Sequence, residues 1–150
     1  MPKSDYIDVN LISGENVQAI AQYLPYFSDG SNRFYSVSHQ SMNPYEYSDV
    51  VRAFIRDLYE NNFIQPFNWV SWRESLQAQN LFNHPDNLLQ ASLEDLVKTL
   101  IVILRSDRFI GGQLASHIKD GFIANILRRM IQLHPRVRIN QPDPASTDAA

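Results

Sequence analysis

The sequence contains no cysteine, and this absence removes several classes of site. Disulfide bonds, thiolate nucleophiles and cysteine-ligated zinc are all excluded. Long apolar runs are missing too: none approaches the roughly 20 residues that a membrane-spanning helix needs. The first residues do not lead into the apolar segment of a secretory signal. We therefore expect a cytoplasmic protein without membrane contact.

Catalytic and phosphate-binding patterns are equally scarce. The chain has only five glycines, and none is spaced as in a P-loop or a dinucleotide-binding loop. None of the four histidines is paired in the spacing of a zinc protease helix. His117 and Asp120 lie three residues apart and could share a metal, but two ligands are too few to indicate a metal site. The sequence thus predicts no catalytic residue, no metal and no cofactor, and whether the chain is an enzyme stays open, with the balance against it.

What is present suits one domain with one core. The chain has 150 residues, of which 44% are hydrophobic, and a domain of this size buries about 70% of its unfolded surface. We expect a single helical domain over residues 1–134. Residues 135–150 contain several prolines and small polar residues but little apolar material, so a flexible C-terminal tail is predicted there.

Charge is distributed unevenly along the chain. Residues 1–95 carry 5 Lys or Arg and 12 Asp or Glu, a net charge of −7, whereas residues 96–140 carry 8 and 2, a net charge of +6. The last ten residues add −2, which gives the overall −3. Such asymmetry is typical of a basic surface for an anionic partner, or of an acidic half that packs against a basic half. We favour the second interpretation because it requires no partner.

Helical periodicity dominates and predicts a mainly α fold, a compact bundle of about five to six helices. Its centre is expected over residues 93–104, where Ser92 and Asp95 form a capping box before a segment that is apolar on nearly every side. Helices that are apolar all round are buried ones. The other helices are expected to begin after Ser13, Ser48, Asn68, Gly112 and Gly121.

Short alternating patterns near the N-terminus predict a minor two-stranded β element. Ile7, Val9 and Leu11 alternate with polar residues, which is typical of a half-buried strand. Tyr35 and Val37 form a second, weaker candidate that could pair with the first. Whether the two candidates pair remains open at this point.

Several short motifs give the chain a family resemblance. They are Phe67-Asn68-Trp69 with Trp72, Arg105-Ser106-Asp107-Arg108-Phe109 with Gly112, and Gly121 with Ile126-Leu127-Arg128-Arg129-Met130. Over roughly residues 45 to 133 this order resembles a small bacterial family catalogued only as a domain of unknown function. That family usually shows Asp at position 68 and Leu at position 130, and the Asn found here removes a carboxylate. The resemblance implies an intact domain and no particular activity.

Five charged residues form the main candidate site for an anion or a partner: Arg105, Asp107, Arg108, Arg128 and Arg129. If the last helix packs against the end of the central helix, several guanidinium groups could converge, and their fork geometry suits phosphate or carboxylate. In the alternative interpretation, Asp107 pairs with an arginine and fixes the corner at Gly111 and Gly112. We favour this structural interpretation because charge networks often serve the fold.

Trp69 and Trp72 are the second candidate site. The two indoles lie three residues apart near Phe63 and Phe67, and together they could line an interface hot spot. Aromatic residues at helical spacing are more often part of a core, and we favour that interpretation.

The sequence alone does not establish a function, so three hypotheses are kept. The first is a non-enzymatic protein-interaction module that binds another protein or itself. The second is binding of nucleic acid, a nucleotide or another anion through the arginines of residues 96–140. Against it, the pI is near 5.7, whereas nucleic-acid-binding domains often exceed about 9. The third is a small hydrolase or nuclease whose site has no familiar motif.

Overall fold

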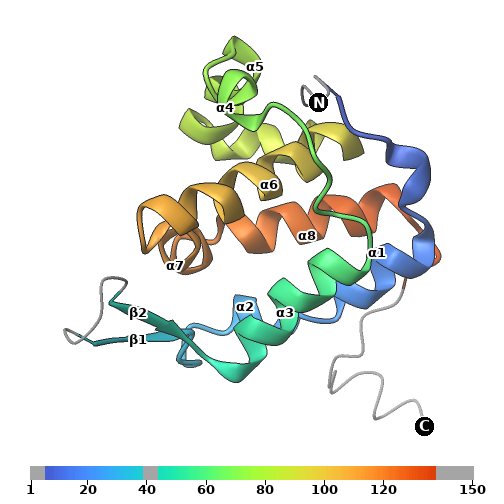
Figure 1. Cartoon of the computed structure of the whole chain (residues 1–150). Coiled ribbons are helices and arrows are strands. Elements are labelled where there is room, and N and C mark those ends of the chain that lie inside the picture. Colours follow the sequence, from blue (N-terminus) through green and yellow to red (C-terminus); the bar gives the residue numbers. More distant parts are fainter. Residues whose placement is uncertain (1–5, 39–43, 138–150) are drawn as a thin grey trace, which may run out of the picture.

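The computed structural model describes residues 6–38 and 44–137, and over this part of the chain it confirms the mainly α fold (Figure 1). Helices and one two-stranded sheet make up the regular structure. In chain order the elements are the 3-10 helix η1 (Val9–Leu11), α1 (Gly14–Ala21), α2 (Leu24–Ser28), β1 (Tyr35–Val37), β2 (Tyr45–Tyr47), α3 (Asp49–Glu60), α4 (Trp69–Arg73), α5 (Leu76–Asn83), the 3-10 helix η2 (Pro85–Gln90), α6 (Leu93–Phe109), α7 (Gln113–Lys119) and α8 (Phe122–Leu133).

Helix α6 is the buried central helix that the sequence predicts, and it continues five residues beyond the expected end. Ser92 caps it, since its hydroxyl accepts a hydrogen bond from the Asp95 amide at 3.2 Å. The residues from Leu96 to Leu104 are all buried, including Lys98 and Thr99. The fold thus has one core with α6 at its centre.

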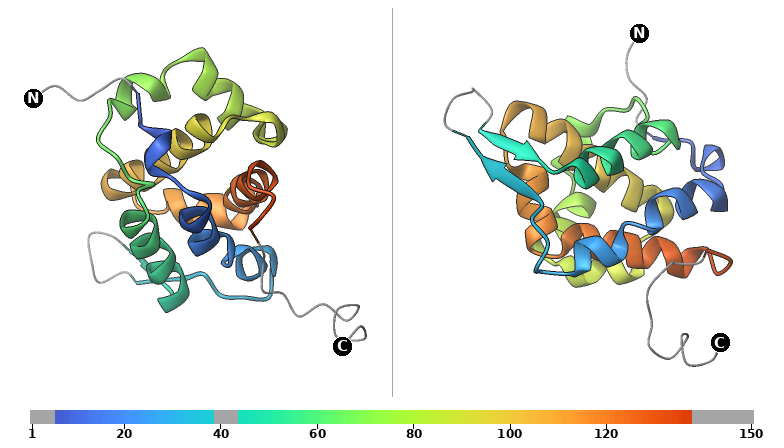
Figure 2. Two further views of the ribbon diagram at one scale, coloured as in Figure 1. Left: turned by 90° about the vertical axis from the view of Figure 1, so that its right-hand side faces the viewer. Right: turned by 90° about the horizontal axis from the view of Figure 1, so that it is seen from below.

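The helices are arranged in three layers, and α6 lies in the middle one. Figure 1 shows α1, α2 and α3 on one side, α6 and α8 crossing the middle, and α4 and α5 on the other side. The left view of Figure 2 shows the same order from another direction. Helix α8 contacts both α1 and α2, while α4 contacts α6. This arrangement leaves the C-terminal end of α6 and the short α7 at one end of the molecule, beside the sheet.

Two of the six expected helices are each divided, which gives eight α-helices among the described residues. Pro25 lies in the first turn of α2, after α1 has ended at Ala21. Proline is tolerated in the first turn of a helix because a backbone N–H group there would have no hydrogen-bond acceptor within the helix. Ser75 begins α5 after α4 has ended, because its hydroxyl accepts a hydrogen bond from the Ala78 amide at 3.1 Å.

The predicted strand over Ile7, Val9 and Leu11 is wrong. This segment contains η1, because the Asp8 carboxylate accepts a hydrogen bond from the Asn10 amide at 3.0 Å and stabilises a local turn. The sheet instead pairs β1 with β2 in antiparallel register, with Tyr35 opposite Tyr47 and Val37 opposite Tyr45. A β element therefore exists near the N-terminus, with a different partner from the one proposed.

The described chain ends in contact with the core. Val137 is buried and its amide donates a hydrogen bond to the His134 carbonyl at 3.0 Å. Within the expected tail, residues 138–150 lie outside the described residues. No helix in the described part of the chain has the length and apolar character needed to cross a membrane.

Candidate functional site

Asp107 holds the corner between α6 and α7. Its Oδ1 atom accepts hydrogen bonds from the Tyr47 hydroxyl at 2.8 Å and from the amides of Gly112 and Leu114 at 3.1 Å each. The first amides of a helix have no partner within the helix, and a carboxylate there also suits the helix dipole. Asp107 therefore caps α7, and among the described residues no Lys, Arg or His nitrogen lies within ion-pair distance of it.

Tyr47 completes this cap from the sheet. Its hydroxyl oxygen accepts a hydrogen bond from the Ala115 amide at 3.2 Å while its proton goes to Asp107. Burial raises the pKa of Tyr47 well above its usual range, and the hydrogen bond to Asp107 and the charge of that carboxylate raise it further. The phenol is therefore neutral and donates to the carboxylate.

Gly112 explains the glycine of the motif. Its φ angle is +96°, a left-handed conformation that disfavours any residue with a side chain. A Cβ atom at this position would also lie 2.7 Å from two carbons of the Tyr45 ring. Asp107 and Gly112 thus serve the fold, and they fix the direction in which the end of α6 points.

The two arginines of α6 lie beside this corner. Arg108 is exposed and its Nη2 donates a hydrogen bond to the Tyr59 hydroxyl at 3.3 Å. Arg105 is half-buried and has no hydrogen-bond or ion-pair partner among residues 6–38 and 44–137. Neither arginine forms an ion pair with a carboxylate of the described residues.

The two arginines of α8 have different neighbours. Arg129 Nε donates to the carbonyl of Ala91, just after η2, at 2.9 Å. Arg128 donates to Asn125 at 2.9 Å and to Ser28, at the end of α2, at 3.1 Å. The arginines that have partners thus contact different elements: Arg108 contacts α3, Arg128 contacts the end of α2, and Arg129 contacts the segment after η2.

Trp72 belongs to the core, as the favoured interpretation has it. It packs edge-on against Phe67 with ring centroids 6.4 Å apart. The buried ammonium of Lys98 lies 5.9 Å from the centre of Trp72 and 5.8 Å from that of Phe67, and 3.9 Å from Glu94. The Lys98 ammonium thus contacts two aromatic faces and one carboxylate within the core.

Trp69 has different surroundings. It stacks on Phe109 with ring centroids 6.2 Å apart and an interplanar angle of 27°. Phe109 is 78% exposed and the following Ile110 is 61% exposed. We call Trp69, Arg105, Arg108, Phe109 and Ile110 the α4–α6 face. Phe109 and Ile110 were not predicted to be surface residues. Their position just before two glycines is a signal that could have found them, because apolar side chains can leave the core at a helix end.

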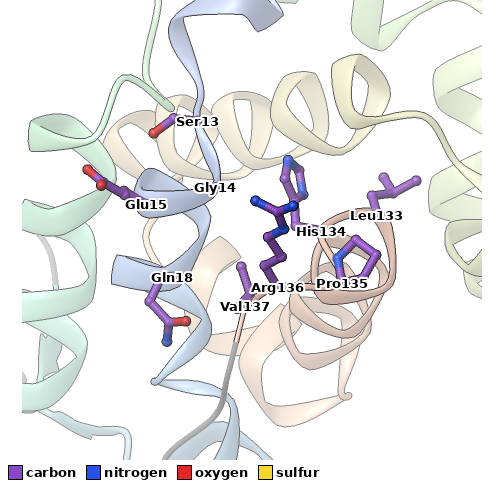
Figure 3. A pocket seen from close by; sticks show the side chains of 9 residues that line it. All are labelled: Ser13, Gly14, Glu15, Gln18, Leu133, His134, Pro135, Arg136 and Val137. Carbon is purple, nitrogen blue, oxygen red and sulfur yellow. The ribbon is translucent and has the colours of Figure 1, made fainter.

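Another hollow lies between the first turn of α1 and the segment after α8 (Figure 3). His134, Pro135 and Arg136 stand on one side of it, and Glu15 and Gln18 on the other. The volume is about 950 Å³, and Val137 also lines the hollow. His134 Nδ1 bonds to the carbonyl of Met130 at 3.0 Å, so that nitrogen is not directed at a ligand.

Over residues 6–38 and 44–137, no group of three or more His, Asp or Glu side chains is placed to hold a metal ion. His117 Nδ1 and Asp120 Oδ2, the pair that the sequence singles out, are 3.6 Å apart. At this distance the two groups form no hydrogen bond.

The domain is helical, and its motif residues Asp107 and Gly112 hold the α6–α7 corner. The chain belongs to DUF6508, a family of unknown function, whose model matches residues 12–136. This confirms the resemblance seen in the sequence and extends it toward the N-terminus. No curated protein and no solved structure matches the chain.

Proposed function

We propose that this domain is a non-enzymatic protein-interaction module that binds its partner through the α4–α6 face. The observation that carries the proposal is the stacked pair of Trp69 and Phe109, in which one ring is mostly exposed. When a partner covers a large exposed aromatic side chain, apolar surface is removed from water, and this favours binding. Protein interfaces and their hot spots are enriched in aromatic residues and in arginine.

The face is ordered before any partner arrives. Trp69 fixes one side of the Phe109 ring, and Phe109 lies in the last turn of α6, whose direction is set by Asp107 and Gly112. A rigid aromatic contact loses little conformational entropy on binding. Four of the five face residues, all except Ile110, therefore belong to the motifs on which the family resemblance rests.

Charge indicates what kind of partner fits. Arg105 precedes Phe109 by one helical turn, so both lie on the same side of α6, and Arg108 is held only by a hydroxyl. Guanidinium groups beside an apolar centre match a partner surface with an apolar middle and carboxylates at its edge. The partner is therefore expected to be another acidic protein or a second copy of this chain, whose residues 1–95 are acidic.

Site-specific photo-crosslinking in cells tests the proposal. A photoreactive phenylalanine analogue replaces Phe109 in the full chain, and the same analogue at Leu11, which is 51% exposed on η1, is the matched control. We expect a discrete crosslinked species from position 109, which mass spectrometry identifies as this chain or as another protein. Position 11 should give none. Trp69→Ala and Arg105→Glu should each reduce the yield at least fivefold.

The opposite results would refute the proposal. Equal crosslinking from positions 109 and 11, or a yield that Trp69→Ala and Arg105→Glu leave unchanged, would show that the face has no specific partner. Sedimentation of the purified chain separates the two kinds of partner, because a second copy gives a concentration-dependent mass.

Binding of nucleic acid or a nucleotide through converging arginines has less support. Arg128 and Arg129 bond to α2 and to the end of η2, away from Arg105 and Arg108. No described group of residues favours a hydrolase or nuclease over the other hypotheses.

A further inference from the structure

A cleft of about 320 Å³ lies between α5, α6 and α7, next to the end of α4. Phe82, Val102 and Ile103 give it an apolar floor, and Arg73, Ser106 and His117 line the polar part. Small-molecule sites usually combine an apolar lining with a few convergent polar groups, and their volumes begin at about 300 Å³. The cleft has this composition and is at the small end of that range.

Arg73 and Ser106 form the charged end of the cleft. Arg73 Nη1 lies 3.4 Å from Ser106 Oγ, a long contact that leaves most donors of the guanidinium group unused. Ser106 is only 7% exposed. Its hydroxyl is thus a buried polar group whose side chain points to the cleft, whereas the next residue, Asp107, points to α7.

His117 supplies the other polar side. Its ring packs against Phe82 and Phe122, with centroid distances of 5.8 and 4.8 Å. Nδ1 is buried and has no hydrogen-bond partner among the described residues, because Asp120 Oδ2 is 3.6 Å away. Burial lowers the pKa of His117, and the nearby Asp120 carboxylate only partly opposes this. The imidazole is therefore neutral near pH 7.

We propose that this cleft binds a small organic monocarboxylate whose apolar body lies on Phe82, Val102 and Ile103 and whose carboxylate meets Arg73. The planar guanidinium fork matches a carboxylate with two parallel hydrogen bonds. Arg73 is the one charged residue that lines the cleft, and a neutral His117 adds no second positive charge. One cation balances a monoanion, whereas a phosphate dianion would need more.

This inference is independent of the interaction face. Ile110 lies at the edge of both, but the cleft opens toward α5 and α7, and its polar groups are not those of the α4–α6 face. Either proposal can therefore fail without affecting the other.

Titration of the full chain with benzoate tests the cleft, with benzamide as the neutral probe of the same shape. We expect benzoate to shift the ring resonances of His117 saturably, in the millimolar range or below, and benzamide to bind at least tenfold more weakly. Arg73→Gln should weaken benzoate binding at least tenfold. Arg56→Gln, on α3 and mostly exposed, is the control and should leave the affinity unchanged.

A second variant separates binding in the cleft from simple attraction to Arg73. Gln113→Phe keeps the guanidinium group and fills the mouth of the cleft, so benzoate binding should be lost. This variant and the comparison with benzamide still decide the matter if Arg73→Gln lowers the thermal midpoint. Equal binding of benzoate and benzamide, competition by inorganic phosphate at the same concentration as benzoate, or unchanged binding to Gln113→Phe would each overturn the proposal.

Discussion

The hydroxyl of Tyr47 donates a hydrogen bond to Asp107 Oδ1 at 2.8 Å and thereby links β2 to the α6–α7 corner, 60 residues further along the chain. Helix α7 has only seven residues and Gly112 at its N-cap offers no side chain. Its amides depend instead on Asp107 and on the Tyr47 oxygen. Tyr47 in the sheet therefore helps to satisfy the first backbone amides of the distant helix α7.

Tyr47→Phe removes this link and should lower the free energy of unfolding by about 1.5–3 kcal/mol. A hydrogen bond to a charged group has about this value, and the Ala115 amide would lose its acceptor. Tyr59→Phe is the matched control, since the Tyr59 hydroxyl also contacts a charged side chain, Arg108, but in the open. In Tyr59→Phe the free energy of unfolding should change by no more than about 0.5 kcal/mol. Urea denaturation measures both.

A double-mutant cycle then tests the pairing itself. If Tyr47 acts through Asp107, the loss in Tyr47→Phe/Asp107→Asn should be smaller than the two single losses combined, by about 0.5–3 kcal/mol. Strict additivity would show that the hydroxyl stabilises the fold by another route.

Gly112→Ala should be the most damaging of three glycine substitutions. At Gly121 the φ angle is +87° but the space is open, so alanine should cost only about 1–2 kcal/mol. At Gly112 the contact with the Tyr45 ring adds to the same conformational cost, and overpacking adds about 1–3 kcal/mol more. Gly14→Ala, with open space and an ordinary φ angle, should change stability by less than about 1 kcal/mol. We expect the thermal midpoint to be highest for Gly14→Ala, lower for Gly121→Ala and lowest for Gly112→Ala. Equal midpoints for the three variants would contradict this prediction.

The sequence predicted what local chemistry determines. Serine caps at Ser13, Ser48 and Ser92 marked true helix starts, and the all-round apolar segment before Leu104 identified the central helix, because such a helix is stable only when it is buried. Pro25 shows where this approach fails. A proline can end one helix or lie in the first turn of the next, and the path of the chain in space determines which of the two occurs.

Contacts between distant residues could not be predicted. Asp107 was expected to pair with an arginine, but its neighbours are amides in α7 and a hydroxyl in β2. Tyr47 carries no sequence signal for this role, because the partner is 60 residues away and the strand has three residues. Arg105 and Phe109 were visible as motif residues, yet their exposure depends on where α4 packs.

Arg129→Gln should lower stability by about 1–2 kcal/mol, whereas Arg128→Gln should change it by less than about 0.5 kcal/mol. Arg129 bonds to the buried Ala91 carbonyl, which would lose a charged donor. Arg128 is exposed, and its partners, Asn125 and Ser28, can bond to water instead. The adjacent pair is its own control, since the two substitutions are chemically identical. Equal losses in urea denaturation would mean that the contact with Ala91 contributes nothing.

His117 should make the stability of the chain depend on pH below neutrality. Burial lowers the pKa of His117 in the folded state relative to the usual 6.5, despite the opposing charge of Asp120. The unfolded chain therefore binds a proton more readily, and the contribution is fully present above about pH 6.5 and is lost as the pH falls through the lower, folded-state pKa. In His117→Gln the free energy of unfolding should fall less steeply from pH 6.5 downward than in the native chain. Ser116→Gln changes an exposed position of the same helix and should keep the native slope, because the imidazole remains. Parallel profiles for the native chain and His117→Gln would show that the imidazole accepts a proton equally well in both states, and the buried Nδ1 would then have to reach water or a carboxylate on the timescale of the measurement.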